Sequence, residues 1–265
     1  MISKKEIDCQ KLRMDLISIA YKGKSNHLGP NLSIVELMYS IWDNFLDINP
    51  DNFQNKNRDY FILSKGHASL IYYLILCEKG FLKKDFLRES WHKNENIFCE
   101  HPLSSIPGVD ISTGSLGHGP SISVGLATGL PDSKVVAILG DGELNEGSVW
   151  EAAYLAAREQ LGNLLWIIDA NSLQGLGKTQ DVSFNNFKEK FLSFGLETKE
   201  VDGHNLEGIS SYLKSVNFKG QKPHVLIAHT IKGKGISFME NEFSWHYKSL
   251  NEEQYKACMQ EIEIK

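Results

Sequence analysis

Two short apolar runs joined by a helix-forming segment constrain this chain more than any other feature of its sequence. Residues 135–139 (VVAIL) and 164–168 (LLWII) are rich in apolar side chains, which is typical of strands buried on both faces of a sheet. Residues 148–160, which lie between them, are rich in alanine and favour a helix. This order predicts a right-handed βαβ unit with parallel strands.

Each predicted strand ends in a short polar segment. Gly-Asp-Gly at 140–142 follows the first strand, and Asp-Ala-Asn at 169–171 follows the second. Parallel neighbours end at the same edge of a sheet, where open α/β sheets bind ligands, so Asp141 and Asn171 should lie side by side there. Their oxygens suit Mg²⁺, which is often shared with a phosphate. Gly142 and the following helix would let that phosphate approach the backbone, which predicts a metal–diphosphate site.

The same pattern resembles the thiamine-diphosphate motif, in which GDG is followed by about thirty residues and an asparagine. Taken alone, GDG could be an ordinary tight turn, but the flanking strands and helix favour a ligand site. From about residue 25 to residue 246 the chain also resembles the N-terminal half of transketolase. This resemblance rests on ordered segments: SNHLG at 25–29, LSKGHAS at 63–69, HP at 101–102, TGSLGHG at 113–119, GDGELNEG at 140–147, IDAN at 168–171, HTIKGKG at 229–235 and WHYKS at 245–249.

The resemblance implies a fold and a cofactor. The fold would be an α/β domain with a doubly wound, mostly parallel sheet and helices on both faces. The cofactor would be thiamine diphosphate with Mg²⁺, or with Ca²⁺ or Mn²⁺ in its place. Asp141 and Asn171 would bind the metal through their side chains, and the resemblance adds the backbone carbonyl of Leu173. Gly142 would contact the diphosphate, and Ala170 stands where many members carry Asn or Asp.

Nine histidines form a second set of candidates. Four lie in matching motifs, and the resemblance places them around the diphosphate and the reacting carbon: His27, His67, His101 and His246. Imidazole titrates near neutral pH and can hydrogen-bond sugar hydroxyls without a fixed charge, which suits proton transfer during sugar chemistry. We expect these four to be catalytic, with His67 and His246 also binding the cofactor. His92, His204 and His224 are expected to be ordinary core or surface groups.

A glycine-rich loop and two glutamates complete the predicted site. The resemblance implies that Gly114 and Leu116 contact the cofactor's aminopyrimidine through their backbone, whereas His118 replaces the more usual glutamine. Glu146 and Glu151 lie around the start of the predicted helix at 148–160. They either complement the helix dipole or, by resemblance, form a carboxylate network at a subunit interface that touches the cofactor-activating glutamate of the partner. We include Glu146 among the cofactor-binding residues.

The resemblance also implies a partner. Thiamine diphosphate needs an activating glutamate, which transketolases supply from a second α/β domain across a dimer interface. The sequence ends at Lys265, soon after WHYKS. We therefore expect the N-terminal subunit of a split transketolase, inactive alone and assembled as an α₂β₂ heterotetramer with a C-terminal subunit. The reaction would transfer a two-carbon ketol unit from a ketose phosphate to an aldose, so sugar phosphates are the expected substrates.

Two alternatives stay open at this stage. One is a subunit of another thiamine-diphosphate enzyme, for example one like deoxyxylulose-phosphate synthase. The other is a non-catalytic member that binds the cofactor, although the presence of both Asp141 and Asn171 weighs against it. A nicotinamide-binding domain fits poorly, because no GxGxxG opens a helix after the first strand.

Composition and charge disfavour other classes. The net charge is −5 and no block of Lys and Arg forms a basic stripe, so nucleic acid is not an expected partner. The longest apolar runs, such as residues 70–77, are too short to span a bilayer, and the charged N-terminus lacks an apolar signal core, so no membrane association is expected. Four scattered cysteines without CxxC spacing favour reduced thiols in a cytoplasmic protein.

The remaining segments predict one domain over residues 1–265, with the N-terminal helices of residues 1–50 packed on it. Strands and helices alternate, which indicates a parallel, doubly wound sheet. Asn31 or Ser33 could cap the second helix. Helices are expected at residues 6–21, 31–45, 68–79, 121–129, 187–194 and 206–216, further strands at 60–63, 197–201 and 224–231, and a loop folded over the site at 89–110.

Overall fold

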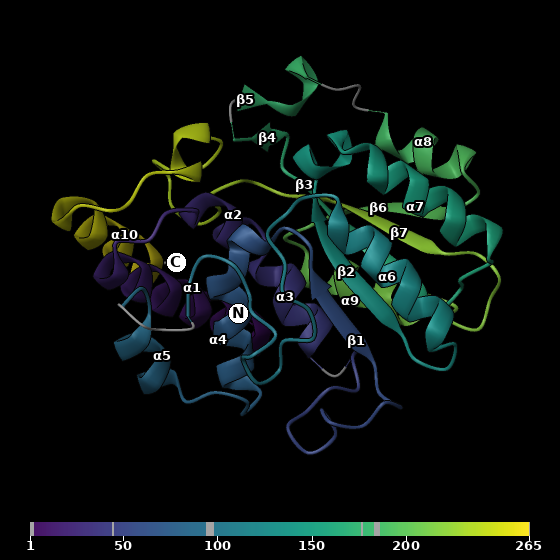
Figure 1. The fold of residues 1–265 in the computed structure, drawn as a ribbon. Coiled ribbons are helices and arrows are strands. Elements are labelled where there is room, and N and C mark those ends of the chain that lie inside the picture. The colour runs from purple at the N-terminus through teal and green to yellow at the C-terminus, as the bar shows by residue number, and fades with distance from the viewer. Residues whose placement is uncertain (1–2, 44, 94–97, 176, 183–185, 265) are drawn as a thin grey trace.

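The computed structural model describes residues 3–43, 45–93, 98–175, 177–182 and 186–264. Its main sheet has five strands, all parallel, in the order β1–β2–β3–β7–β6 (Figure 1). These strands are β1 (Tyr60–Leu63), β2 (Val135–Gly140), β3 (Leu164–Ala170), β7 (His224–His229) and β6 (Glu197–Asp202). The expected parallel α/β sheet is therefore confirmed.

Helices cover both faces of this sheet (Figure 1). Each strand presents alternate side chains to opposite faces, so that Val136 and Ile138 belong to one apolar core and Val135 and Ala137 to the other. The first core includes residues of α1 (Lys4–Gly23), α2 (Leu28–Ser33), α3 (Val35–Trp42), α4 (Ser69–Glu78) and α9 (Leu206–Ser215). The second core includes residues of α6 (His118–Gly129), α7 (Gly147–Arg158) and α8 (Phe187–Ser193).

The N-terminal helices share the first core with the sheet. Leu16 of α1 and Met38 of α3 are fully buried in it, together with Leu165 of β3. Ser3 starts α1 with a capping box, in which its side chain and that of Glu6 each bond the other's backbone N–H. This shared core supports the interpretation of residues 1–265 as a single domain, which stays a prediction.

The helix expected at residues 31–45 is instead two helices, α2 and α3. The chain leaves the helical conformation at Ile34, where φ is −110° and ψ is 15°. Asn31 and Ser33 lie inside α2 and do not cap it. Their side chains bond other elements: the amide oxygen of Asn31 accepts from the N–H of Ile71 at 2.9 Å, and the Ser33 hydroxyl donates to Asp169 at 2.8 Å. The capping prediction was wrong because these polar groups link α2 to the rest of the fold.

Several elements were not predicted. They are α5 (Lys84–Ser90), α10 (Glu252–Ile264) and the antiparallel hairpin of β4 (Leu173–Gln174) and β5 (Gly177–Lys178). The loop expected at residues 89–110 overlaps the end of α5, and its residues 94–97 lie outside the described part of the chain. All four cysteines are free. Among the described residues, no helix has the length and apolar character needed to cross a membrane.

Candidate active site

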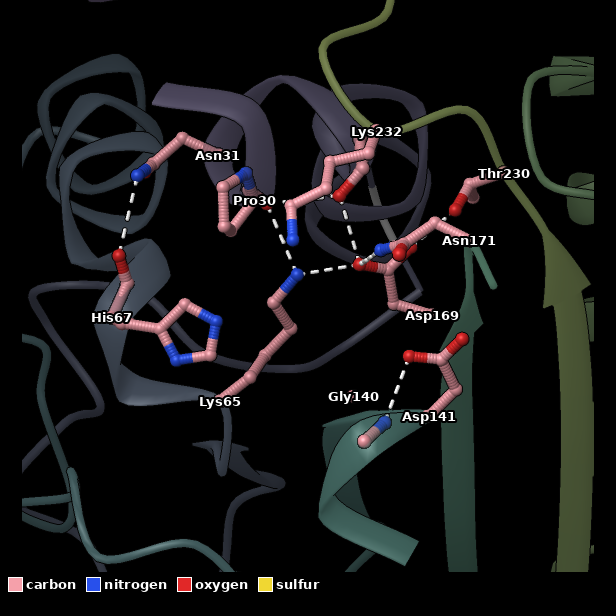
Figure 2. A network of polar contacts seen from close by, with 12 residues as sticks. Pro30, Asn31, Lys65, His67, Gly140, Asp141, Asp169, Asn171, Thr230 and Lys232 are labelled. Carbon is pink, nitrogen blue, oxygen red and sulfur yellow. Dashed lines mark hydrogen bonds and ion pairs between the residues drawn. The ribbon is translucent and has the colours of Figure 1, made fainter. Parts of the chain in front are cut away.

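The candidate site lies where four neighbouring strands of the sheet end. The strands β1, β2, β3 and β7 are adjacent in this order, and a polar residue follows each of them. In the same order across the sheet, these residues are Lys65, Asp141, Asn171 and Lys232. Figure 2 shows their side chains gathered at one edge. The expected pairing of the GDG strand with the Asn171 strand is confirmed, because β2 and β3 are parallel neighbours.

Asp141 is a buried carboxylate that neutral groups hold in place. Its Oδ1 accepts a hydrogen bond from the N–H of Gly142 at 2.8 Å. Its Oδ2 accepts from the N–H of Ser172 at 2.7 Å and from the hydroxyl of Thr179 at 3.1 Å. Burial, together with the nearby charge of Asp169, raises the pKa of Asp141 to about 6. A bound cation would offset both effects, so this carboxylate fits the predicted role of a metal ligand.

Asn171 follows β3 directly, and Leu173 begins β4 two residues later. The side-chain amide of Asn171 donates to Asp169 at 2.9 Å, and its oxygen accepts from the N–H of Leu173 at 3.0 Å. With Asp141, they offer one carboxylate, one amide oxygen and one backbone carbonyl, which are the hard ligands that Mg²⁺ prefers. In the described part of the chain, no three His, Cys, Asp or Glu side chains converge on a metal site. The proposed ligand set does not require three such side chains, because two of its three ligands are an amide oxygen and a backbone carbonyl.

Asp169 is fully buried and is the centre of the polar network in Figure 2. Four side chains donate hydrogen bonds to its carboxylate: Ser33, Lys65, Asn171 and Thr230. The ammonium of Lys65 also donates to the carbonyl of Pro30 at 3.0 Å. Burial opposes ionisation, but the charge of Lys65 and these hydrogen bonds outweigh it and lower the pKa of Asp169. The network therefore fixes α2 against the ends of β1, β3 and β7.

Lys232 brings a second buried cation to the same edge. Its Nζ lies 3.0 Å from Nδ1 of His246 and 3.4 Å from the carbonyl oxygen of Leu173. Burial and the charge of Lys65 lower the pKa of Lys232 to about 8. Figure 2 shows the ends of the two lysine side chains directed toward each other, which concentrates positive charge at the site. This arrangement suits an anion.

Three of the four predicted catalytic histidines form one cluster. The ring of His27 lies 5.5 Å from that of His67 and 5.1 Å from that of His246, and the latter two rings are 5.1 Å apart. Burial and the charge of Lys65 lower the pKa of His67 well below its ordinary value. Burial and the charge of Lys232 lower the pKa of His246 to about 3. Both rings are therefore neutral near pH 7 and suited to hydrogen-bonding hydroxyls.

The fourth predicted histidine, His101, packs against the glycine-rich loop that precedes α6. Gly114 has φ +150°, and a Cβ at this position would lie only 2.8 Å from Cδ2 of His101, so the loop needs glycine there. Glu143 holds the other end of the loop, because its buried carboxylate accepts from the N–H of Gly117 at 2.9 Å and from that of Gly140 at 3.2 Å. The loop is thus fixed beside the end of β2.

A cleft of about 440 Å³ opens among these groups. It is lined by Pro30, Lys65, His67, Leu116, Gly140, Asp141, Gly142, Glu143, Asn145, Glu146, Asp169, Asn171, Leu173, Gln174, Gly175, Val182, Lys232, His246 and Tyr247. Most of the predicted cofactor-binding residues are in this lining, whereas His27, His101 and Gly114 are not. The ring of His27 contacts two residues of the lining, His67 and His246.

Other predicted features have simple placements. Glu146 and Glu151 are both exposed, so they are accessible to a partner, and the interface role stays a prediction. Ala170 packs against the core on the α6–α8 face, opposite the Asp169 network, as expected for its alternation along the strand. His118, the departure from glutamine, is exposed and lies 3.2 Å from the carbonyl of Ser115, within its own turn.

The histidines expected to be structural do bond neighbouring groups. His204 lies 3.0 Å from the carboxylate of Glu36 through Nδ1, and its Nε2 accepts from the N–H of Ile231 at 2.8 Å. His224 is buried beside the carbonyl of Asn217 at 3.3 Å. His92 contacts the carboxylate of Glu100 at 3.1 Å.

Sequence reasoning overlooked four buried charged residues at the site. They are Lys65, Glu143, Asp169 and Lys232. All four are in segments that carry the resemblance, within or shortly after the strands. Their positions in the sequence could have revealed them. A charged side chain just after a strand that is buried on both faces is expected to lie at the ligand-binding edge of the sheet.

Comparisons with known proteins point to one family. The family model described as "Transketolase, thiamine diphosphate binding domain" matches residues 3–264. A protein of Phocaeicola vulgatus named as a subunit of apulose-4-phosphate transketolase is 36% identical over 262 residues, which cover 97% of this chain and 93% of that protein. The 6-deoxy-6-sulfo-D-fructose transketolase subunit SqwG of Clostridium sp. is 34% identical, over 89% of this chain and 88% of that protein.

Single-chain transketolases match over part of their length only. Human transketolase is 33% identical over 95% of this chain, which spans 41% of the human protein. The crystal structure of transketolase from Campylobacter jejuni superposes with a TM-score of 0.91 at 28% identity, over 99% of this chain and 43% of that one. Because the chain matches nearly the whole of two proteins named as transketolase subunits, we conclude that it belongs to the transketolase family and corresponds to the N-terminal, thiamine-diphosphate-binding subunit of a split enzyme.

Proposed function

We propose that this subunit, together with a separate C-terminal subunit, transfers a two-carbon ketol unit from a ketose phosphate to an aldose with thiamine diphosphate and Mg²⁺. The observation that carries the proposal is the row of polar groups at the ends of β1, β2, β3 and β7, which lines one cleft with His67 and His246. Relatives named as transketolase subunits favour ketol transfer over the alternatives of a deoxyxylulose-phosphate synthase-like enzyme and a non-catalytic binder.

In this proposal Asp141, Asn171 and the carbonyl of Leu173 hold the metal, and the Gly142 backbone contacts the diphosphate. Lys65 and Lys232 add positive charge near the same anion. Gly142 is required for a second reason, since a Cβ there would lie 2.9 Å from Cβ of Gln174. Gly114 and Leu116 would meet the aminopyrimidine through their backbone. When bound, thiamine diphosphate supplies ylid and electron-sink chemistry.

The histidines supply orientation and proton transfer. Lys232 can only donate to Nδ1 of His246, so the proton of this ring is on Nε2, which makes Nε2–H a donor to a sugar hydroxyl or carbonyl. The neutral ring of His67 would hydrogen-bond a sugar hydroxyl without adding charge to the site. His27 and His101 complete the set, with His101 held beside the loop at Gly114. Each ring thereby binds or relays a proton at a hydroxyl.

The substrates and the assembly belong to the proposal. The two relatives are named for anionic ketoses, a sugar phosphate in one and a sulfonated sugar in the other. We propose a donor of the same kind, whose anionic end contacts the C-terminal subunit. That second chain would also supply the activating glutamate, next to the exposed Glu146 and Glu151, in an α₂β₂ heterotetramer.

Reconstitution tests the proposal. The purified chain is mixed with the C-terminal subunit, thiamine diphosphate and Mg²⁺, and product formation is measured with a ketose phosphate and an aldose. We expect ketol transfer from the mixture and none from either chain alone. Pyruvate as donor is the matched comparison: turnover of pyruvate without transfer from ketoses would favour the deoxyxylulose-phosphate synthase-like alternative. Full activity of this chain without any partner would contradict the split-enzyme proposal.

A further inference from the structure

Glu100 lies beside the histidine cluster and has no part in the proposed function so far. Its Oε2 is 3.4 Å from Nδ1 of His27. Its Oε1 accepts from the N–H of Asn26 at 3.0 Å and lies 3.1 Å from Nε2 of His92. One carboxylate therefore joins two imidazoles and the turn that leads into α2.

The contacts of His92 fix its protonation. Its Nε2 faces the carboxylate of Glu100, and its Nδ1 lies 3.2 Å from the carbonyl oxygen of Gly23. Both partners are acceptors, so both ring nitrogens carry protons and His92 is the charged imidazolium. Its ring stacks on Trp91 at 4.7 Å, and the indole N–H of Trp91 donates to Ser25. The ring of His92 is thus held by Trp91, which is itself bonded to the turn that leads into α2.

The ionisation of Glu100 agrees with this arrangement. Burial opposes its charge, but the hydrogen bonds from His27 and His92 outweigh burial and lower the pKa of Glu100 to about 2. The hydrogen bond to Glu100, opposed in part by burial, raises the pKa of His92. An ionised carboxylate is an acceptor only, so Nδ1 of His27 must be the nitrogen that carries the proton. In the neutral ring, Nε2 of His27 is then left as an acceptor.

The backbone of His27 is fixed independently of its ring. His27 has φ +58°, and its N–H donates to the carbonyl of His246 at 3.1 Å. The titratable groups that face its ring are Glu100, His67, His246 and Tyr247, and His101 is also nearby. Of these, Glu100 alone is ionised as an acceptor, so it decides the tautomer of His27.

We propose that Glu100 is a positioning residue that holds His27 in the Nδ1–H tautomer, with His92 as its charge partner, so that Nε2 of His27 accepts the proton of a sugar hydroxyl. The proposal rests on the proposed function for what His27 does, but its structural part concerns this chain alone. A purely structural role for Glu100, as an anchor for the segment between α5 and α6, makes different predictions.

The test compares wild-type protein with Glu100→Gln. The glutamine oxygen can still accept from the N–H of Asn26, so the segment stays anchored, whereas the charge that selects the tautomer is lost. In the reconstituted complex we expect kcat to fall about tenfold or more, with KM nearly unchanged. In ¹⁵N imidazole spectra of the chain alone, His27 should change from Nδ1–H to a mixture of tautomers, and the pKa of His92 should fall toward its ordinary value of about 6.5.

Asp15→Asn is the matched control. The side chain of Asp15 is 16% exposed, close to the 18% of Glu100, and it pairs with Lys84 and Arg88 of α5, which leads into the same segment. This variant should leave kcat and the His27 tautomer as in the wild type. An equal loss in Asp15→Asn would mean that anchoring of the segment explains the effect, and the proposal would be overturned.

His92→Gln is a second, independent variant. It keeps a hydrogen-bond donor but removes the positive charge beside Glu100, so the pKa of Glu100 should rise and the acid limb of the kcat profile should move to higher pH. The proposal fails if His27 of the wild type is the Nε2–H tautomer, or if Glu100→Gln changes neither tautomer nor kcat in an active complex. An inactive wild-type complex would refute the proposed function instead, while the spectra would still decide the tautomer.

Discussion

The buried pair of Lys65 and Asp169 allows a quantitative prediction. Their side chains are 2% and 0% exposed, and both line the cleft. Asp169→Asn keeps the shape of the side chain but leaves the ammonium of Lys65 facing a neutral amide and the carbonyl of Pro30. Breaking a buried ion pair on one side costs about 3–5 kcal/mol, out of a total free energy of unfolding of about 5–15 kcal/mol. We expect Asp169→Asn to lose about 3 kcal/mol or more.

Urea unfolding of the cofactor-free chain at pH 7 measures this loss, with Lys65→Met as the second single variant. The double variant leaves no unpaired charge, so its loss should be smaller than the sum of the two single losses by about 2 kcal/mol. Additive losses, within about 0.5 kcal/mol, would refute the reasoning, because independent sites behave in that way.

Three further predictions concern other parts of the molecule. Burial opposes ionisation of Glu36, but Arg13 lowers its pKa to about 2. The shift stabilises the fold by roughly 3 kcal/mol above about pH 4.5, and this stabilisation is lost as the pH falls through about 2. Glu36→Gln should therefore flatten the acid limb when the free energy of unfolding is measured against pH. Gly66→Ala would place a Cβ 2.9 Å from the N atom of Gly114, so we expect at least about tenfold weaker thiamine-diphosphate binding by fluorescence titration, and unchanged affinity would contradict it. Lys232→Met should also weaken cofactor binding about tenfold, with a smaller salt dependence than in the wild type.

The central strands of the main sheet, β2, β3 and β7, were predictable because they are buried on both faces. The runs at 135–139 and 164–168 are apolar throughout, so neither fits a strand or helix with one polar face. The polar residues that follow them mark one common edge of the sheet. The interruption at Ile34 was not predictable from periodicity, because nearly all residues of both α2 and α3 are buried, polar ones included. The side chains of Asn31 and Ser33 serve distant partners, which a local capping rule cannot detect.

The candidate site was predictable where a local motif contains the residues, and not where distant segments meet. Asp141 and Asn171 lie directly after strands and His67 lies four residues after β1, so their placement follows from the strand order. Glu100 reaches His27 across more than seventy positions of sequence, and no local pattern marks that contact. Lys232 and His246 likewise interact only because the segment after β7 returns to the sheet edge.

The central claim is that Asp141 binds a divalent cation that holds the diphosphate at the edge of β2 and β3. Its most direct test is calorimetric titration of thiamine diphosphate into the reconstituted complex, with Mg²⁺ and with a chelator, for the wild type and for Asp141→Asn. Asp202→Asn, at the end of the outer strand β6, is the control. The account predicts Mg²⁺-dependent binding that Asp141→Asn weakens at least about a hundredfold and that Asp202→Asn leaves unchanged. Equal, Mg²⁺-dependent affinity in the wild type and Asp141→Asn would contradict it.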